Sequence, residues 1–369
     1  MKVMSVFGTR PEAIKMCPLI KKMQEYEEIE SIVCLTGQHK EMLQQVIDIF
    51  NIRVDYNLHI MKPSQTLTSI TTDILTLVKP VLEKEKPDIV LVHGDTTTSF
   101  AVALAAFYEQ IPVGHVEAGL RTYDKYAPYP EEMNRTLTSR IAELHFAPTK
   151  ANQLNLEKEN IVKNVYITGN TVIDALQTTI RPDYVYKSNQ LNGLSFEEKK
   201  VILVTAHRRE NLGEPLYHIC EAVKEIVNAY SDVEAVYPVH LNPRVRETVE
   251  KVLGKDPKVH LIEPIDVEDM HNLMARSCLV MTDSGGIQEE APSCGIPVVV
   301  LRNETERQEA IDAGTVVLAG TEKEDIIREV HMLLDDADRY HQMAKAINPY
   351  GDGHASERII EALLKYFEE

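Results

Sequence analysis

Short apolar runs alternate with amphipathic helical stretches along almost the entire chain. Each apolar run has the length of one β-strand, and the runs lie at residues 2–7, 31–36, 88–93, 112–117, 144–147, 164–168, 200–205, 233–238, 258–262, 278–282, 297–301 and 315–318. The clearest helical patterns lie between them, at 11–26, 66–85, 97–109, 214–230 and 322–334. Strands that alternate with helices predict βαβ units and parallel sheets, so the expected class is α/β.

A chain of 369 residues is too long for one typical hydrophobic core, so we expect two domains. The strand–helix series breaks once, in a polar and turn-rich stretch at 181–199, which places the boundary between Gly169 and Lys199. We therefore expect a first domain at 1–170 and a second at 171–354. The amphipathic tail 355–369 follows a Pro/Gly-rich breaker and forms a separate helix.

The net charge of −18 argues against nucleic acids and anionic membranes as partners. No apolar run approaches the roughly 18 residues of a membrane span, and the start lacks a signal-peptide pattern. The five cysteines are scattered without a CxxC pair, which indicates reduced thiols in the cytoplasm. His and Cys do not show zinc-ligand spacing, so we expect no metal.

The segment from Met281 to Glu290 (MTDSGGIQEE) reads as a strand end, a glycine turn and a helix start. Unpaired N–H groups at Ser284, Gly285 and Gly286 would favour an anion, and Glu290 lies about one helical turn further on, where it can reach a polyol. The alternative is an ordinary helix after a buried strand, capped by Ser284 or Asp283.

Basic residues follow other predicted strands. Gly8 is followed by Arg10 and, within a helix, Lys15, although no P-loop or GxGxxG pattern is present. The strand at 200–205 runs into His207, Arg208 and Arg209, which suit phosphate contacts, and Arg307 follows the strand at 297–301. Solvated helix caps and surface ion pairs are the alternatives.

Three acids follow consecutive elements of the first domain, namely Asp95, Glu117 and Glu131. Taken singly, Asp95 can be a helix N-cap, Glu117 a salt-bridge partner and Glu131 a first-turn acid. Carboxyl ends of parallel strands meet at one sheet edge, where ligands bind, so we expect the three to cluster. Clustered carboxylates have separated pKa values, which supplies a proton acceptor and a proton donor near neutral pH.

Eight segments together identify a family resemblance. They are FGTRPEAIK (7–15), VHGDTTT (92–98), HVEAGLRT (115–122), PEEMNR (130–135), TGNTVIDA (168–175), TAHRREN (205–211), TDSGGIQEEAPS (282–293) and NPYGDG (348–353). The chain resembles the non-hydrolysing UDP-N-acetylglucosamine 2-epimerases over essentially its whole length. The resemblance implies the GT-B fold, with two Rossmann-like parallel-sheet domains facing across a cleft and a C-terminal helix that returns to the first domain.

The resemblance also implies an activity. Family members are homodimers that interconvert UDP-GlcNAc and UDP-ManNAc without NAD or another cofactor, which supplies ManNAc for cell-surface polysaccharide. UDP leaves as a base takes the C2 proton, and it adds back to the resulting 2-acetamidoglucal after reprotonation on the other face. By motif, Asp95, Glu117, Glu131 and His207 would be catalytic. The UDP-sugar would be bound by Arg10, Lys15, Met270, Ser284, Gly285, Gly286, Glu290 and Arg307.

The sequence departs from the family pattern at several positions. Gln308 replaces a proline after Arg307, and Met270 replaces a residue that is often aromatic. Many bacterial members have a second, regulatory UDP-GlcNAc site, for which the matching positions are Gln38, Gln65, Glu131, Arg208 and His240. Glu41 and Ser64 differ from the regulated pattern, which weakens the expectation of allostery.

Three alternatives remain on sequence alone. A GT-B glycosyltransferase would share the nucleotide site but needs only one base. A hydrolysing epimerase would release ManNAc and UDP. A non-catalytic UDP-sugar sensor would not need Asp95, Glu117, Glu131 and His207.

Overall fold

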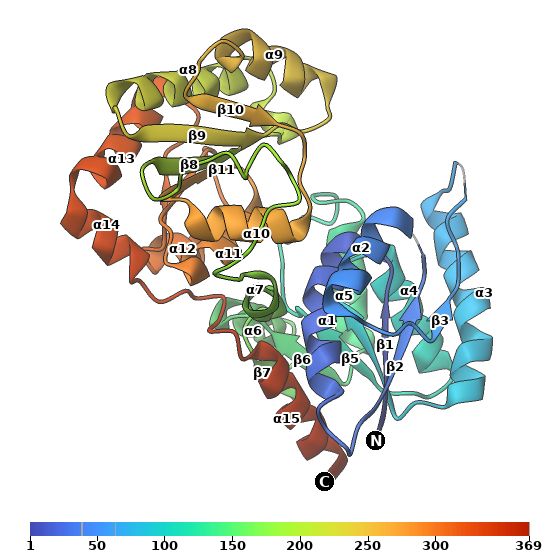
Figure 1. The fold of residues 1–369 in the computed structure, drawn as a ribbon. Helices are drawn as coiled ribbons and strands as arrows, with labels where there is room; N and C mark the ends of the chain where they lie inside the picture. The colour runs from blue at the N-terminus through green and yellow to red at the C-terminus, as the bar shows by residue number, and fades with distance from the viewer. Residues whose placement is uncertain (38–39, 63, 369) are drawn as a thin grey trace. The chain divides into compact units, whose positions relative to one another are not determined.

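The computed structural model describes residues 1–37, 40–62 and 64–368. The chain divides into two compact units, each with its own parallel sheet (Figure 1). The first unit contains Met1–Thr178 together with Tyr350–Glu369, and the second contains Thr179–Pro349.

The first unit is built on a seven-stranded sheet in the order β3-β2-β1-β4-β5-β6-β7. Every neighbouring pair in this sheet is parallel. The strands are β1 Lys2–Phe7, β2 Glu30–Leu35, β3 Tyr56–Asn57, β4 Ile89–His93, β5 Val113–Val116, β6 Leu144–Ala147 and β7 Val165–Ile167. Strands β1 and β4 are almost entirely buried, as their continuous apolar sequences predict.

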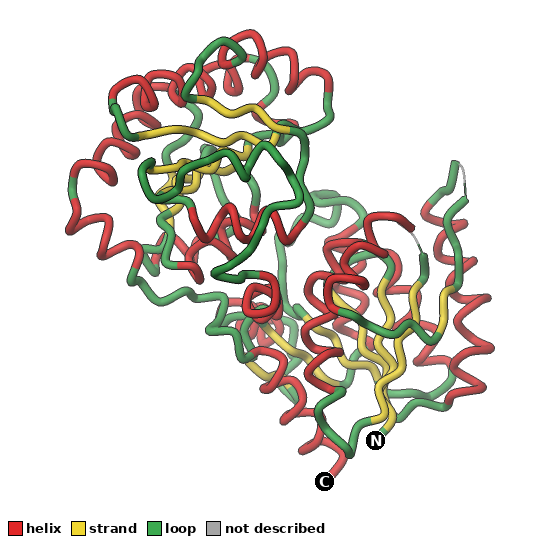
Figure 2. Tube along the Cα trace, viewed as in Figure 1, coloured by secondary structure: helices red, strands yellow, loops and turns green. Residues whose placement is uncertain are grey.

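Helices lie on both faces of this sheet, as Figure 2 shows. They are α1 Arg10–Met23, α2 Lys40–Phe50, α3 Leu67–Glu85, α4 Thr97–Tyr108, α5 Glu131–Ile141, α6 Lys150–Lys158, α7 Thr171–Thr179 and α15 Ala355–Glu368. Helix α1 packs against α2 and α15, whereas α4 packs against α3 and α5. The C-terminal helix α15 thus belongs to the first unit and buries one apolar stripe there.

The second unit has a six-stranded sheet in the order β10-β9-β8-β11-β12-β13, again parallel throughout. Its strands are β8 Lys200–Thr205, β9 Val233–Pro238, β10 Val259–Ile262, β11 Leu279–Thr282, β12 Val298–Val300 and β13 Val316–Leu318. The helices are α8 Glu214–Ala229, α9 Pro243–Leu253, α10 Val267–Arg276, α11 Gly285–Glu290, α12 Gln308–Asp312, α13 Lys323–Asp335 and α14 Ala337–Ala344, with 3₁₀ turns η1 Arg209–Asn211 and η2 Ala291–Cys294.

Both sheets reverse their strand order at one point, between β1 and β4 in the first unit and between β8 and β11 in the second. In open parallel sheets ligands bind beyond the carboxyl ends of the strands at such a switch point. The loops that leave β1 and β4 contain Thr9 and Asp95, and those that leave β8 and β11 contain His207 and Ser284. The topology therefore places Asp95, His207 and Ser284 beyond the carboxyl ends of strands at the two switch points.

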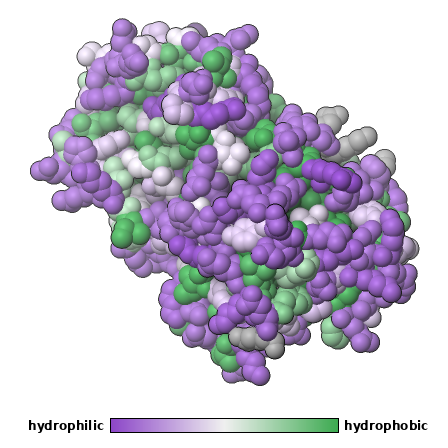
Figure 3. Space-filling model, turned by 60° about the horizontal axis from the view of Figure 1, so that its bottom comes forward, coloured by the Kyte–Doolittle hydropathy of each residue, from purple (hydrophilic) through white to green (hydrophobic). Residues whose placement is uncertain are grey.

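The twelve predicted strands are all confirmed, as is the α/β class with two parallel sheets. The additional strand β3 was missed because it has only two residues and no apolar run. The face in Figure 3 is largely hydrophilic, with hydrophobic residues in small groups. Within the described ranges, no helix is long and apolar enough to cross a membrane.

Candidate active site

The Glu12 side chain is hydrogen-bonded to both loops at the switch point of the first unit, the loop after β1 and the loop after β4. Thr9 and Glu12 form a capping box at the start of α1, the arrangement that the spacing Thr-x-x-Glu favours. The buried Glu12 carboxylate accepts hydrogen bonds from the Gly8 and Thr9 N–H groups at 3.0 and 2.8 Å. It also accepts one from the Thr96 hydroxyl at 2.7 Å. The loops after β1 and β4 are therefore fixed relative to each other.

Asp95 is not a helix cap, because the side chain of Thr96 caps α4 by accepting from the Ser99 N–H at 3.1 Å. The Asp95 carboxylate is 31% exposed, and its Oδ2 lies 3.7 Å from Nη2 of Arg135. Burial raises the pKa of Asp95 from 3.8 to about 6, with Arg135 opposing the rise and the charges of Glu117 and Glu131 adding to it. Asp95 can therefore both take up and release a proton near neutral pH.

Glu117 follows β5 and is held from three sides. Its Oε1 accepts hydrogen bonds from Nζ of Lys15 and, at 3.1 Å, from Nδ2 of Asn170. Its Oε2 lies 3.6 Å from Nε2 of the buried His93. The Glu117 backbone has a φ of 62°, a left-handed conformation that is unfavourable for this residue type. Strained residues of this kind cluster at functional sites.

The predicted cluster of acids is present in the first unit. Asp95 and Glu117 follow neighbouring strands, and Glu131 is the first residue of α5, close enough for its charge to raise the pKa of Asp95. Arg10, the first residue of α1, is half-buried beside the same switch point. Three carboxylates and the cations Arg10 and Lys15 therefore lie at one edge of one sheet.

Replacing Asp95 by Asn is expected to stabilise the protein, because the folded state binds the Asp95 proton more tightly than the unfolded state. Between the ordinary pKa of 3.8 and the raised value of about 6, wild-type stability falls as the pH rises. The variant should therefore melt on the order of 3 °C higher than wild type at pH 8. At pH 4 the difference in melting temperature between the variant and wild type should be smaller. A variant that melts below wild type at pH 8 would show that the ionised Asp95 does not destabilise the fold.

Asp283 organises the switch point of the second unit. Its buried Oδ2 accepts hydrogen bonds from the N–H groups of His207 and Arg208, both at 2.8 Å, and from Nδ2 of Asn211 at 3.0 Å. One carboxylate at the end of β11 thus shapes the loop that leaves β8. The sequence suggested Asp283 only as a helix cap, whereas the structure shows that it orders the basic loop.

Ser284 is the N-cap residue of α11, yet its side chain makes no capping hydrogen bond. Helix α11 starts at Gly285, and a Cβ added there would lie 3.0 Å from Cζ of Arg307. The Arg307 guanidinium therefore lies over the first turn of this helix, as expected of a residue near a bound anion. It is paired with Glu289 at 2.8 Å and with Glu306 at 2.6 Å.

Four further residues of the second unit were predicted to belong to a site. Oε2 of Glu290 lies 3.2 Å from Nε2 of the buried His271, which fixes the carboxylate. The His207 ring stacks on His240 with centroids 5.0 Å apart. Burial lowers the pKa of His207. His240 and Arg208 lower it further, whereas the negative charge of Asp283 opposes this change. Met270 is half-buried on α10.

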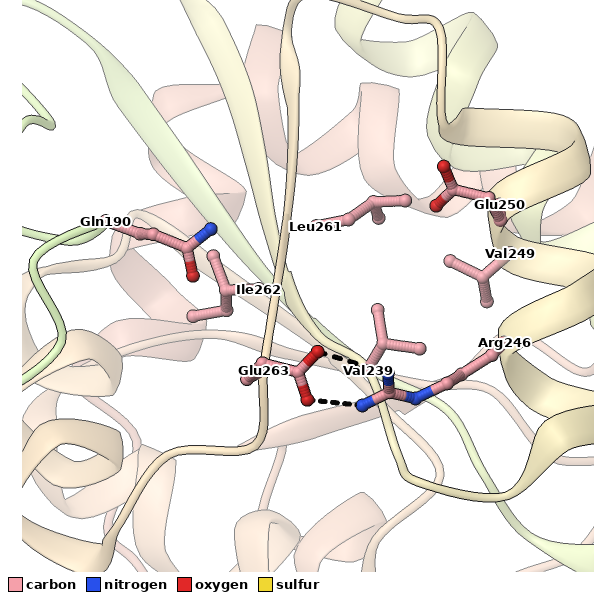
Figure 4. Close-up of a pocket in the computed structure, with 8 residues that line it drawn as sticks. All are labelled: Gln190, Val239, Arg246, Val249, Glu250, Leu261, Ile262 and Glu263. Carbon is pink, nitrogen blue, oxygen red and sulfur yellow. Dashed lines mark hydrogen bonds and ion pairs between the residues drawn. The ribbon is translucent and has the colours of Figure 1, made fainter.

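The second unit also contains a cavity of about 340 Å³, which is lined in part by Val239, the neighbour of His240 in the chain. Figure 4 shows an ion pair between Arg246 and Glu263 beside the apolar side chains of Val249 and Leu261. No predicted site residue lines this cavity, so it carries none of the expected chemistry. Among the described residues, no group of three or more His, Cys, Asp or Glu side chains is arranged to hold a metal ion.

Comparison with known proteins identifies the family of this chain. The UDP-N-acetylglucosamine 2-epimerase family model matches residues 21–364. The chain belongs to this family. It is 55% identical to the UDP-N-acetylglucosamine 2-epimerase of Bacillus subtilis, over 100% of this chain and 96% of that protein. The Escherichia coli K12 enzyme of the same name is 53% identical, with 98% of each chain covered.

Solved structures agree with the family assignment. The UDP-GlcNAc 2-epimerase of Neisseria meningitidis, solved with UDP-GlcNAc bound, is 51% identical and matches with a TM-score of 0.88. The match covers 99% of this chain and 100% of that one. The resemblance seen in the eight sequence segments is thereby confirmed for the family and for the fold of the epimerases.

The residues predicted for a regulatory site are distributed over both units. Gln65, whose amide donates to the Ile60 carbonyl at 2.6 Å, and Glu131 lie in the first unit. Arg208, 3.5 Å from Glu306, and His240 lie in the second. Gln38 lies outside the described residues.

Proposed function

We propose that this chain interconverts UDP-GlcNAc and UDP-ManNAc by reversible elimination of UDP. The observation that carries the proposal is the acid cluster of Asp95, Glu117 and Glu131 at the switch point of the first sheet. Family membership and the UDP-GlcNAc bound to the Neisseria meningitidis relative support the choice of substrate.

The proposed chemistry needs at least two proton-transfer groups around the sugar. As the anomeric C–O bond breaks, a carboxylate takes the C2 proton, and the product is 2-acetamidoglucal with UDP still bound. A second acid then returns a proton to the opposite face of C2 while UDP adds back to C1. No electrons are gained or lost overall, so the cycle requires no redox cofactor. Asp95, Glu117 and Glu131 are the groups proposed to move these protons.

Residues of the second unit are proposed to retain the departing UDP. The first turn of α11 offers the N–H groups of Gly285 and Gly286. The N–H of Ser284, which the sequence predicted to be unpaired, instead donates to Oγ1 of Thr282 at 2.9 Å, whereas the Ser284 side chain makes no capping hydrogen bond. Glu290 is proposed to bind the ribose hydroxyls and Met270 to contact the uracil. Arg307, together with Arg10, Lys15 and His207, would offset the negative charge that develops on the leaving diphosphate.

Three further properties are proposed with the activity. A cytoplasmic location is supported by the free cysteines at 17, 34, 220, 278 and 294. The family resemblance supports a homodimer that supplies ManNAc for a surface polysaccharide. We also propose weak regulation by UDP-GlcNAc at a second site. Its residues would be Gln38, Gln65, Glu131, Arg208 and His240, and the affinity would be reduced because Glu41 and Ser64 replace residues of the regulated pattern.

Proton NMR of the purified protein with UDP-GlcNAc tests this function against its alternatives. The proposal is supported if UDP-ManNAc forms until the ratio of UDP-GlcNAc to UDP-ManNAc is constant, and if the same ratio is reached when the reaction starts from UDP-ManNAc. Accumulation of free ManNAc and UDP would indicate a hydrolysing epimerase. Turnover only after an acceptor sugar is added would indicate a glycosyltransferase, and binding without turnover would indicate a sensor.

A further inference from the structure

A buried carboxylate on α5 holds the loop that follows β5. Glu132 is 3% exposed, and its Oε2 accepts a hydrogen bond from the Thr122 N–H at 3.0 Å. Its Oε1 accepts one from the Tyr123 N–H at 2.9 Å. Tyr123 has a φ of 63°, so these two bonds hold a backbone conformation that the residue would otherwise avoid. The start of the loop between β5 and α5 is thus fixed to the first turn of α5.

The same carboxylate is paired with a buried arginine that reaches Asp95. Nε of Arg135 lies 3.1 Å from Oε2 of Glu132, and its Nη2 lies 3.7 Å from Oδ2 of Asp95. The arginine is 7% exposed, so water screens these two pairs only weakly. The neighbouring residue Asn134 donates from Nδ2 to the Asp95 carbonyl at 2.9 Å. Consecutive residues of α5 therefore hold both the side chain and the backbone of Asp95.

Arg135 is the principal positive charge that acts on this carboxylate. Four charged groups influence Asp95: Arg135 and Glu131 from α5, Glu117 from the end of β5 and Lys15 from α1. Burial and the two glutamates favour the protonated form of Asp95, whereas Arg135 and Lys15 favour the ionised form. Because Lys15 is itself hydrogen-bonded to Glu117, part of its charge is offset, whereas the charge of Arg135 is shared between Glu132 and Asp95.

We propose that Arg135 is a positioning residue for the reaction: it links the Asp95 carboxylate to Glu132, which in turn holds the backbone of Thr122 and Tyr123. The proposal rests on the proposed function, because it assigns Asp95 a proton-transfer role. Arg135 itself moves no proton. It keeps one acid of the cluster oriented and ionisable beside two other acids that would otherwise keep it protonated.

The test compares Arg135→Gln and Arg135→Lys with wild type and with Arg140→Gln. Arg140 is the matched control, because it lies on the same helix, is 53% exposed and contacts Glu159 rather than Asp95. The rate of epimerisation is measured from pH 5 to 9 for each protein. In parallel, carbon-13 NMR follows the Asp95 carboxyl in protein labelled at the aspartate side-chain carbon, with Asp95→Asn identifying the signal.

Loss of an opposite charge at this distance is expected to raise the titration midpoint of Asp95 by at least about one pH unit in Arg135→Gln. The corresponding limb of the pH–rate profile should move by the same amount. Lysine keeps the charge but not the planar fork, so Arg135→Lys should give an intermediate midpoint, and Arg140→Gln should match wild type.

The outcomes separate this inference from the proposed function. Unchanged Asp95 midpoints in the folded Arg135 variants, or an equal shift in Arg140→Gln, would overturn the role of Arg135. If Arg135→Gln does not fold, Arg135→Met, which also removes the charge, takes its place, and a wild-type Asp95 midpoint in that variant rejects the role of Arg135. If wild type produces no UDP-ManNAc, the proposed function fails, while the NMR titration still decides whether Arg135 controls Asp95.

Discussion

Replacing Glu117 by Gln is expected to reduce the rate of epimerisation by about a thousand-fold while UDP still binds. The amide has the shape of the carboxylate but cannot exchange a proton, and general acid–base groups contribute 10²–10⁴-fold to rates. Because Lys15, Asn170 and His93 hold Glu117 in place, the substitution should remove the exchangeable proton without moving the side chain. Steady-state kinetics give the rate, and calorimetry gives the affinity for UDP.

The matched control for this substitution is Glu143→Gln. Glu143 is exposed and precedes β6, so it lies at the opposite edge of the same sheet from Glu117. Its replacement should leave both the rate and the affinity for UDP unchanged. A Glu117→Gln enzyme that keeps more than about a tenth of the wild-type rate would remove Glu117 from the acid–base set. A parallel loss of UDP affinity would instead mark it as a nucleotide contact.

Replacing Asp283 by Ala is expected to lower the free energy of unfolding by about 3–5 kcal/mol and to weaken UDP binding. The substitution leaves the N–H groups of His207 and Arg208 and the amide of Asn211 without their shared acceptor. The loop that leaves β8 would then no longer hold His207 in place. Chemical denaturation measures the loss of stability, and calorimetry measures UDP binding in the variant that remains folded.

Two comparisons make the effect of Asp283 specific. Asp283→Asn keeps an oxygen acceptor and should retain most of the stability. Asp312→Ala removes an exposed carboxylate from α12 that accepts a hydrogen bond from Gln308, and it should change stability by less than about 0.5 kcal/mol. An Asp283→Ala protein that is as stable as the Asp312 variant would show that the loop after β8 is held by other contacts.

Strand positions could be predicted because buried parallel strands require continuous apolar runs. The clustering of Asp95 and Glu117 could also be predicted, because residues that follow neighbouring parallel strands share one edge of the sheet. The spacing of Thr9 and Glu12 is typical of a capping box, whereas the hydrogen bond that the Thr96 hydroxyl donates to Glu12 has no such signal in the sequence. A local sequence pattern relates only residues that are close in the chain. It cannot indicate this hydrogen bond, because the bond joins residues 84 positions apart.

The remaining contacts depend on side-chain directions that a single sequence does not contain. Arg135 reads as an ordinary helical residue, and only the orientation of α5 shows that it reaches Asp95. Asn170 follows β7, yet its contact with Glu117 requires that β7 and β5 end at the same level. Asp95 and Thr96 are both good N-caps, and the backbone of Thr96 decides between them.

Incorporation of deuterium during turnover tests the central claim most directly. The protein is incubated with UDP-GlcNAc in D₂O and followed by proton NMR. If a carboxylate removes the C2 proton and another returns one, UDP-ManNAc forms with deuterium at C2, and the recovered UDP-GlcNAc acquires the label as well. Formation of UDP-ManNAc that retains its C2 proton, or the absence of both exchange and product, would contradict the account.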